Sequence, residues 1–151
     1  MAKIQTAPGI IAKKNLSYFP KVKITKYGGK PNDSKYGITF PCGELIAFGE
    51  TIYLDTDGKL YKAGGASGEA AFGIALSTGD IDDRISIARS GIIECTEYNL
   101  EVGKIVYLNM TSNYPTTIIP SDASGNIFQR LGTAITTTSF EIDIQRGIWY
   151  E

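Results

Sequence analysis

The chain has 151 residues, of which 42% are hydrophobic and 21% are charged, a composition that excludes a disordered polypeptide and suits one compact domain. The net charge of −1 conceals an asymmetry, because residues 1–35 hold eight lysines and one acidic residue, a net +7, whereas residues 36–151 carry a net −8. Histidine is absent, which excludes Ser-His-Asp and Cys-His catalytic arrangements and removes the commonest metal ligand. We therefore expect a protein that is not an enzyme and that needs no cofactor or metal.

Residues 1–35 are predicted to form an extended basic arm. Pro8-Gly9, Pro20 and Gly28-Gly29 interrupt this segment too often for a helix. Between these breaks, residues 21–25 alternate polar and apolar side chains, which indicates a short strand with outward lysines, suited to the edge of a sheet. We expect the arm to dock onto a partner through lysines, namely Lys13, Lys14, Lys21, Lys23 and Lys26.

The charges also indicate the chemistry of the partner. The arm lacks arginine, which base-specific contacts to nucleic acid favour, and the acidic remainder of the chain repels a polyanion. Charge complementarity therefore favours an acidic protein surface over nucleic acid. A solvated lysine-rich face without a partner is the remaining interpretation.

No long apolar span is present and no apolar run of the signal-peptide type follows Met1, so we expect no membrane partner and synthesis in the cytoplasm.

Residues 36–151 are predicted to form one all-β domain. Ile52 and Leu54 fall on one face of a strand, residues 55–58 (Asp-Thr-Asp-Gly) form a turn, and residues 59–62 return as the hairpin partner. Further short strands are indicated at residues 71–76, 85–88, 91–94, 106–108, 130–135 and 140–145. In the last of these, Phe140, Ile142 and Ile144 share one face. About eight to ten such strands predict a small β-sandwich or barrel.

The β domain contains an internal repeat. Residues 49–55 return as residues 103–109, residues 72–76 are answered by 131–135, and residues 85–89 are answered by 142–146. The offsets of the three matches are 54, 59 and 57 residues, and this near-constant spacing predicts two duplicated β units, about 45–92 and 99–147. The repeated residues are small, apolar or β-forming, so they describe a scaffold.

Three polar or glycine-rich segments have structural explanations that we favour over a ligand site. The turn at residues 55–58 lacks the glutamate that a calcium loop carries at its twelfth position, where Ala66 stands. Asp80, Asp82 and Asp83 could hold a divalent cation, but a solvated turn is the preferred interpretation. Residues 64–68 lack the Gly-Lys-Ser/Thr ending of a phosphate-binding loop and are expected to be a flexible connection.

The two cysteines are expected to be buried free thiols. Cys42 and Cys95 stand at comparable places in the two repeats, eleven and twelve residues before Tyr53 and Tyr107. Two cysteines do not make a disulfide framework, and a free cysteine packs as a small hydrophobic side chain. A reactive thiol needs a positive neighbour, whereas acidic residues flank Cys95.

Several stretches together resemble a known family. Residues 49–63 resemble the "G-[DE]-x-V-Y-L-x-x-D-G-K-L-Y-x-A" pattern of small capsid cement (decoration) and head-fibre proteins of tailed bacteriophages. Residues 72–76 are similar to the "G-I-A" strand of this family, residues 100–108 to its second "L-x-x-G-x-x-V-Y-L", and residues 129–134 to its "Q-x-x-G-x-A" strand. The Ile142-Asp143-Ile144 ending is also similar. The resemblance covers about residues 40–146, and the basic arm departs from the simplest members.

The resemblance implies a non-enzymatic structural protein of the virion. Its partners would be the major capsid protein on the outer surface of an icosahedral head, further copies of itself in a homotrimer, and in some members a head-fibre subunit. Such a protein braces neighbouring shell subunits or anchors a fibre. The arm is outside the resemblance, so its docking role is inferred from charge alone.

Two other functions remain open. A receptor- or carbohydrate-binding module would group Trp149, Tyr150 and Tyr114 in one exposed patch, whereas the alternative for Trp149 and Tyr150 is to close a core or a subunit contact. A small trimeric nucleotide hydrolase is the third interpretation, and the lack of a phosphate-loop motif counts against it.

Overall fold

The structure is a computed structural model that describes residues 24–25, 38–64 and 67–151. These residues form twelve short strands and no helix, which confirms the all-β prediction. The number exceeds the eight to ten strands expected. Three of the strands were not predicted, and they have only two or three residues each: Thr39–Pro41, Ile127–Phe128 and Ile148–Trp149. Within the described ranges, no helix is long and apolar enough to span a membrane.

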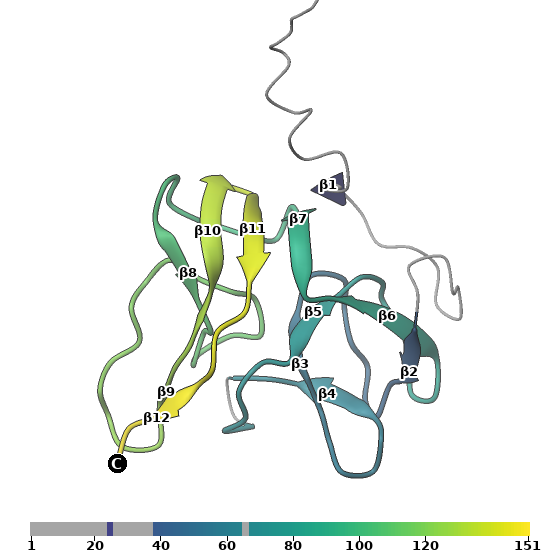
Figure 1. The fold of residues 1–151 in the computed structure, drawn as a ribbon. Coiled ribbons are helices and arrows are strands. Elements are labelled where there is room, and N and C mark those ends of the chain that lie inside the picture. The colour runs from purple at the N-terminus through teal and green to yellow at the C-terminus, as the bar shows by residue number, and fades with distance from the viewer. Residues whose placement is uncertain (1–23, 26–37, 65–66) are drawn as a thin grey trace, which may run out of the picture.

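The strands lie in three open sheets (Figure 1). The first sheet has, in order across it, β2 (Thr39–Pro41), β6 (Arg84–Ala88), β5 (Gly73–Ala75), β3 (Thr51–Leu54) and β4 (Leu60–Lys62). The second has β1 (Ile24–Thr25), β7 (Ser90–Glu94), β11 (Ser139–Asp143), β10 (Arg130–Thr136) and β8 (Ile105–Tyr107). The third pairs β9 (Ile127–Phe128) with β12 (Ile148–Trp149). Of these strand pairs, all but the parallel β1–β7 pair are antiparallel.

The two large sheets share a strand order. The first half of the domain (residues 38–89) runs β2-β6-β5-β3 across its sheet, and the second half (residues 90–151) runs β7-β11-β10-β8. Two of the sequence matches fall on equivalent strands in the same register, β3 with β8 and β5 with β10. The third is shifted: residues 142–146 overlap β11 only at Ile142 and Asp143, and the strand pairing places Ala88 of β6 level with Glu141 instead of Gln145. In the first half β4 covers the outer edge of β3, whereas a single bridge from Thr116 to Tyr107 takes that place beside β8. The origin of the two halves by duplication stays a prediction.

One glycine fixes the same turn in both halves. Gly49 and Gly103 have positive φ angles of 89° and 83°, which glycine adopts without strain. The Gly49 amide donates to the carbonyl oxygen of Ala75 at 2.9 Å, and the Gly103 amide donates to that of Ala134 at 2.9 Å. The repeated Gly-x-x-[Ile/Val]-Tyr-Leu motif thus begins with a turn that leads each chain segment into its strand, β3 or β8.

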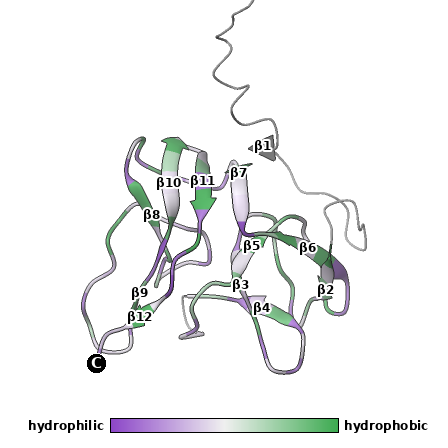
Figure 2. Cartoon of the chain, viewed as in Figure 1, coloured by the Kyte–Doolittle hydropathy of each residue, from purple (hydrophilic) through white to green (hydrophobic). Residues whose placement is uncertain are grey.

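The main core lies between the two halves. Ile74 and Leu76 of the first half pack in one cluster with Val106, Leu131 and Phe140 of the second half. The sheets therefore pack as a small β-sandwich, and Figure 2 shows hydrophobic stretches on strands of both halves, among them β6, β8 and β11. On β11 the expected alternation is confirmed, because Phe140 and Ile142 are buried while Glu141 and Asp143 are exposed.

A second, smaller core lies inside the first half. It consists of Cys42, Ile46, Ile52, Leu60, Ala75 and Ile85. The first sheet curls around these residues until Cys42, just after β2, forms a bridge with Leu60 of β4. A single bridge does not close the sheet into a barrel. Ile52 is fully buried in this core, whereas Leu54, two residues further along β3, is 37% exposed because it extends beyond the core.

The arm touches the body at one described place. Ile24 and Thr25 pair with Ile92 and Ile93 of β7 and occupy an edge of the second sheet, as expected for this stretch. The five lysines expected to dock, Lys13, Lys14, Lys21, Lys23 and Lys26, lie outside the described residues.

The equivalent glycines give a matched test of packing between the halves. A Cβ atom at Gly49 would lie 2.7 Å from the Cys95 sulfur, whereas one at Gly103 would meet no atom within 4 Å. Gly103→Ala should lower the free energy of unfolding by about 1 kcal/mol, through the positive φ alone. Gly49→Ala should lower it by about 2–4 kcal/mol, because overpacking adds to the strain. Urea unfolding of both variants measures this difference. Equal losses in the free energy of unfolding would show that the close contact with Cys95 does not affect stability.

Candidate functional site

An open cleft of about 610 Å³ lies where the two halves meet. Its first wall comes from the first half, from Tyr53 and Leu54 of β3, residues 69–72 before β5, and Arg89 after β6. Its second wall comes from the second half, from Gln129 between β9 and β10, residues 144–147 after β11, and Trp149 of β12. The volume falls within the range of roughly 300–1,000 Å³ that small-molecule sites occupy.

The buried amide of Gln129 joins the two walls. Its side chain is 2% exposed, its Oε1 accepts the Ala71 amide at 2.8 Å, and its Nε2 donates to the Ala71 carbonyl oxygen at 2.9 Å. The same Nε2 also donates to the carbonyl oxygen of Gln145 at 2.9 Å. The side chain thus pairs with the backbone of Ala71 as a neighbouring strand would, and it satisfies buried backbone groups that water cannot reach.

Trp149 forms part of the second wall and keeps one side open. It is 50% exposed, and its indole Nε1 donates to the carbonyl oxygen of Gly68 at 3.2 Å. Gly147 permits this approach, because a Cβ atom there would lie 2.9 Å from the Cβ of Ala70. The ring is thus hydrogen-bonded to a residue of the first half, next to the opposite wall, while much of its surface faces solvent.

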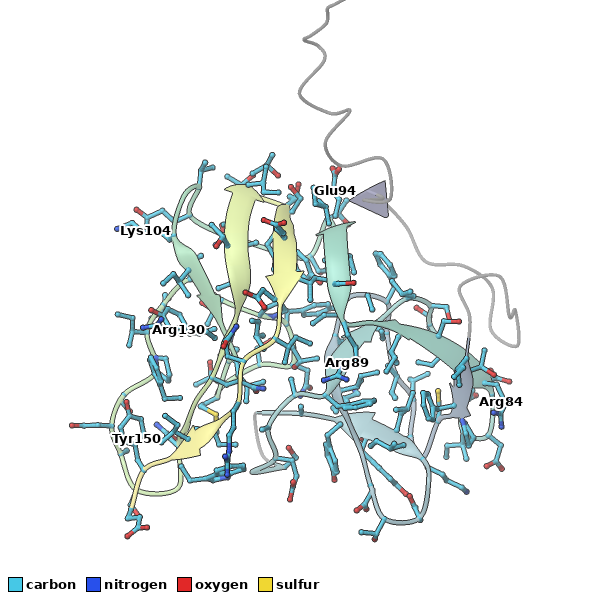
Figure 3. All side chains as sticks on the ribbon, in the orientation of Figure 1. Arg84, Arg89, Glu94, Lys104, Arg130 and Tyr150 are labelled. Atoms are coloured by element: carbon cyan, nitrogen blue, oxygen red, sulfur yellow. The ribbon has the colours of Figure 1, made fainter. Side chains whose placement is uncertain are left out.

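Two arginines line the cleft, and both are only partly engaged. Arg89 donates from Nε to the carbonyl oxygen of Phe72 at 2.9 Å, and its guanidinium carbon lies 4.4 Å from the centre of the Phe72 ring. Figure 3 shows Arg89 on the side of the first half that faces the second. Arg146 is exposed and makes no hydrogen bond or ion pair with the described residues. The terminal nitrogens of both side chains are therefore available to a ligand.

Tyr53, Glu69 and Gln145 also bring polar side chains to the cleft. Burial raises the pKa of Tyr53, and the negative charges of Asp55 and Glu69 add to this effect. A tyrosine hydroxyl is protonated at neutral pH even without such a shift, so Tyr53 can donate a hydrogen bond. The cleft thus combines the indole ring of Trp149, the guanidinium groups of Arg89 and Arg146, the hydroxyl donor of Tyr53 and the carboxylate acceptor of Glu69. These groups suit a ligand that binds by stacking and by charge-assisted hydrogen bonds.

The segments that we did not favour as ligand sites are built into local structure. Residues 55–58 form the predicted hairpin turn, with Gly58 at a φ of 81° and its amide donating to the Asp55 carbonyl oxygen at 2.9 Å. In the acidic turn, the Asp83 carboxylate accepts the Asp80 amide at 2.9 Å, and Asp82 forms an ion pair with Lys59 at 3.1 Å. No group of three potential metal ligands occurs among the described residues.

Both cysteines are buried free thiols, as predicted. Cys42 is fully buried and Cys95 is 3% exposed. Burial, with smaller effects from Asp83 and Asp80, raises the pKa of Cys42 to about 11, and burial also raises the pKa of Cys95. Each follows the first strand of its half, β2 or β7, so the comparable placement expected from the sequence is present.

The three aromatic residues considered for sugar stacking do not all share one role. Trp149 lines the cleft, whereas Tyr150 next to it is not among the lining residues. Tyr114 packs edge-on against Tyr98, with ring centres 6.2 Å apart, at the rim of the main core. Core packing therefore explains Tyr114, and the proposed grouping of all three residues at one site does not occur.

The cleft arginines and Gln129 were not recognised as site residues from the sequence. The sequence match of residues 85–89 with 142–146 does not identify them, because Arg89 follows β6 directly whereas Arg146 lies three residues beyond the end of β11. Their presence in one cleft follows only from the way in which the halves pack, which the sequence pattern does not contain.

Gln129 can be tested as the link between the walls. Gln129→Leu should lower the free energy of unfolding by about 2–4 kcal/mol, because each buried backbone group left unpaired costs about 1–3 kcal/mol. Hydrogen exchange of the Ala71 amide should accelerate, since its acceptor is lost. The control is Gln145→Leu, which removes an exposed glutamine side chain from the same cleft and should change stability by less than about 0.5 kcal/mol. Similar losses in both variants would contradict a linking role for Gln129.

Comparison with known proteins adds no assignment to this geometry. No protein-family model matches the chain, and no curated protein sequence matches it at a significant level. The cleft, the exposed strand faces and the sequence resemblance are therefore the observations on which its function is proposed.

Proposed function

We propose that the chain is a structural virion protein that binds the outer surface of an icosahedral phage capsid. It acts as a decoration or cement protein that braces shell subunits, or it anchors a head fibre. Its partners are the major capsid protein and further copies of itself in a homotrimer. The mechanism is binding without chemistry.

The observation that supports this proposal most is the position of the family-like motifs in the fold. The stretches that resemble cement-protein patterns lie on β3 and β8 and on β5 and β10, and the matched ending lies at β11. Each motif alone is short, but their order agrees with the shared strand order of the two halves. The motif residues Ile52, Ile74 and Val106 are fully buried, so the motifs build the scaffold and leave its outer surface for the partner.

The outer face of the second sheet suits contact with a shell. Cross-strand partners Ile105, Thr133 and Glu141 form an exposed row across it. Ile105 and Ile135 are 36% and 43% exposed, which provides apolar area next to polar groups. β1, the described part of the arm, lies at an edge of this same sheet. If this face and the arm both contact the shell, the overall affinity exceeds that of either contact alone, because the two contacts are linked in one chain.

Electrostatic docking of the arm can be tested on heads of the phage that encodes the protein. A variant with Lys13, Lys14, Lys21, Lys23 and Lys26 all changed to glutamine should bind purified heads more weakly than the parent chain. Its binding should also depend less on salt, because screening weakens only the charge contribution. Co-sedimentation with heads that lack the protein, at several salt concentrations, measures both effects.

The control for this experiment keeps the charge. Changing the same five lysines to arginine preserves the +7 arm and should leave binding and its salt dependence near those of the parent. If the glutamine variant binds as well as the arginine variant, the arm does not dock by charge. If the parent chain does not bind heads at all, the proposed function is wrong.

A further inference from the structure

The cleft contains a fixed aromatic platform. Trp149 is half exposed, and the hydrogen bond from its indole Nε1 to the Gly68 carbonyl oxygen, at 3.2 Å, limits the rotation of the ring. Exposing a large aromatic ring to water is unfavourable unless another group covers it. The C–H groups on one side of a sugar ring carry partial positive charge and are attracted to the negative face of an aromatic ring. A fixed, open indole is thus suited to stacking with a sugar.

The same cleft presents two guanidinium groups to a ligand. Arg89 is anchored by its Nε atom and by the Phe72 ring, and its terminal N–H groups make no hydrogen bond with the described residues. Arg146 has no partner among the described residues. A guanidinium fork binds a carboxylate with two parallel hydrogen bonds, and anchoring reduces the entropy lost on binding. The site therefore favours a ligand with a carboxylate.

We propose that this cleft binds an acidic sugar of the uronic acid class. The sugar ring stacks on Trp149, and its carboxylate accepts hydrogen bonds from Arg146 and Arg89. Tyr53 and Glu69 provide a donor and an acceptor for the ring hydroxyls. The cleft volume of about 610 Å³ suits one or two sugar units of a longer chain that leaves through the open side. This binding activity is additional to head binding and does not depend on it.

An acidic peptide has the same carboxylate chemistry but fits the cleft less well. Glu69 also lines the cleft, and the ionised side chains of an acidic peptide have no hydrogen-bond donor for its carboxylate. A sugar hydroxyl, in contrast, can donate a hydrogen bond to Glu69. The flat indole surface also matches a sugar ring better than a flexible acidic side chain.

Fluorescence provides a direct test, because Trp149 is the single tryptophan of the chain. Titration with galacturonic acid and glucuronic acid oligosaccharides should change its emission to saturation. Neutral glucose and galactose oligosaccharides of the same length should bind at least about ten-fold more weakly, since they lack the charge-assisted hydrogen bonds. Tetraglutamate is the peptide probe, and it should produce no saturable change.

Two pairs of variants identify the residues involved. Arg146→Ala should weaken uronate binding at least about ten-fold. Arg130→Ala should have no effect, although Arg130 also lies over an aromatic ring, 5.8 Å from the Phe128 centre, because it is outside the cleft. Calorimetry should show loss of binding in Trp149→Ala and normal binding in Tyr150→Ala, which removes the neighbouring aromatic ring outside the cleft.

Several outcomes would overturn this proposal. It is wrong if neither uronate series binds, if the neutral sugars bind equally well, or if tetraglutamate binds and the uronates do not. It is also wrong if Arg130→Ala weakens binding as much as Arg146→Ala. Urea unfolding of each variant identifies any loss of folding, and Arg146→Lys supplies a conservative variant that keeps the charge but should still bind more weakly, because lysine has no planar fork.

Discussion

One buried amide links the two halves at the cleft. Gln129 pairs with both backbone groups of Ala71 and with the Gln145 carbonyl, so one side chain holds three chain segments together. A leucine of similar size would fill the space but leave these buried backbone groups unpaired. The apolar core between the sheets supplies most of the driving force for association, whereas directional hydrogen bonds fix how the halves meet: those of Gln129, and also Tyr98 to Gly49 at 2.8 Å and Thr51 to Asn113 at 3.1 Å. The cleft and the positions of Arg89 and Arg146 are consequences of that arrangement.

Scaffold and contact surfaces lie on different faces of the same strands. The repeated motifs contribute to β3, β5 and β6 and to β8, β10 and β11, and their apolar side chains fill the two cores. The residues available to partners are the exposed ones, on the outer face of the second sheet and around the cleft, and those of the basic arm. A protein that braces a shell needs a rigid body with several separate contact surfaces, and two packed sheets with apolar cores provide such a body. A sugar-binding cleft on the same body would allow the chain to bind a sugar on the surface of a host cell while it stays attached to the phage head.

Local patterns in the sequence predicted much of the fold. Alternation on β11, the Asp-Gly turn at residues 55–58 and the two buried thiols were all predicted, because each depends on residues close together in the chain. The cleft was not predicted, since it depends on contacts between residues 58 and 81 positions apart, Gln129 with Ala71 and Trp149 with Gly68. Leu54 illustrates the same limit: the strand period placed it on a face with Ile52, but only the extent of the core determines that it is partly exposed.

The central claim is that this chain occupies the outer surface of a phage head. The most direct measurement is electron cryomicroscopy of purified virions, with and without the gene for this chain. The proposed function predicts extra density on the outside of the shell, with the two-sheet body resting on the major capsid protein, and its loss when the gene is deleted. Virions with identical shell density in both preparations, and with no trace of the chain by mass spectrometry, would contradict it.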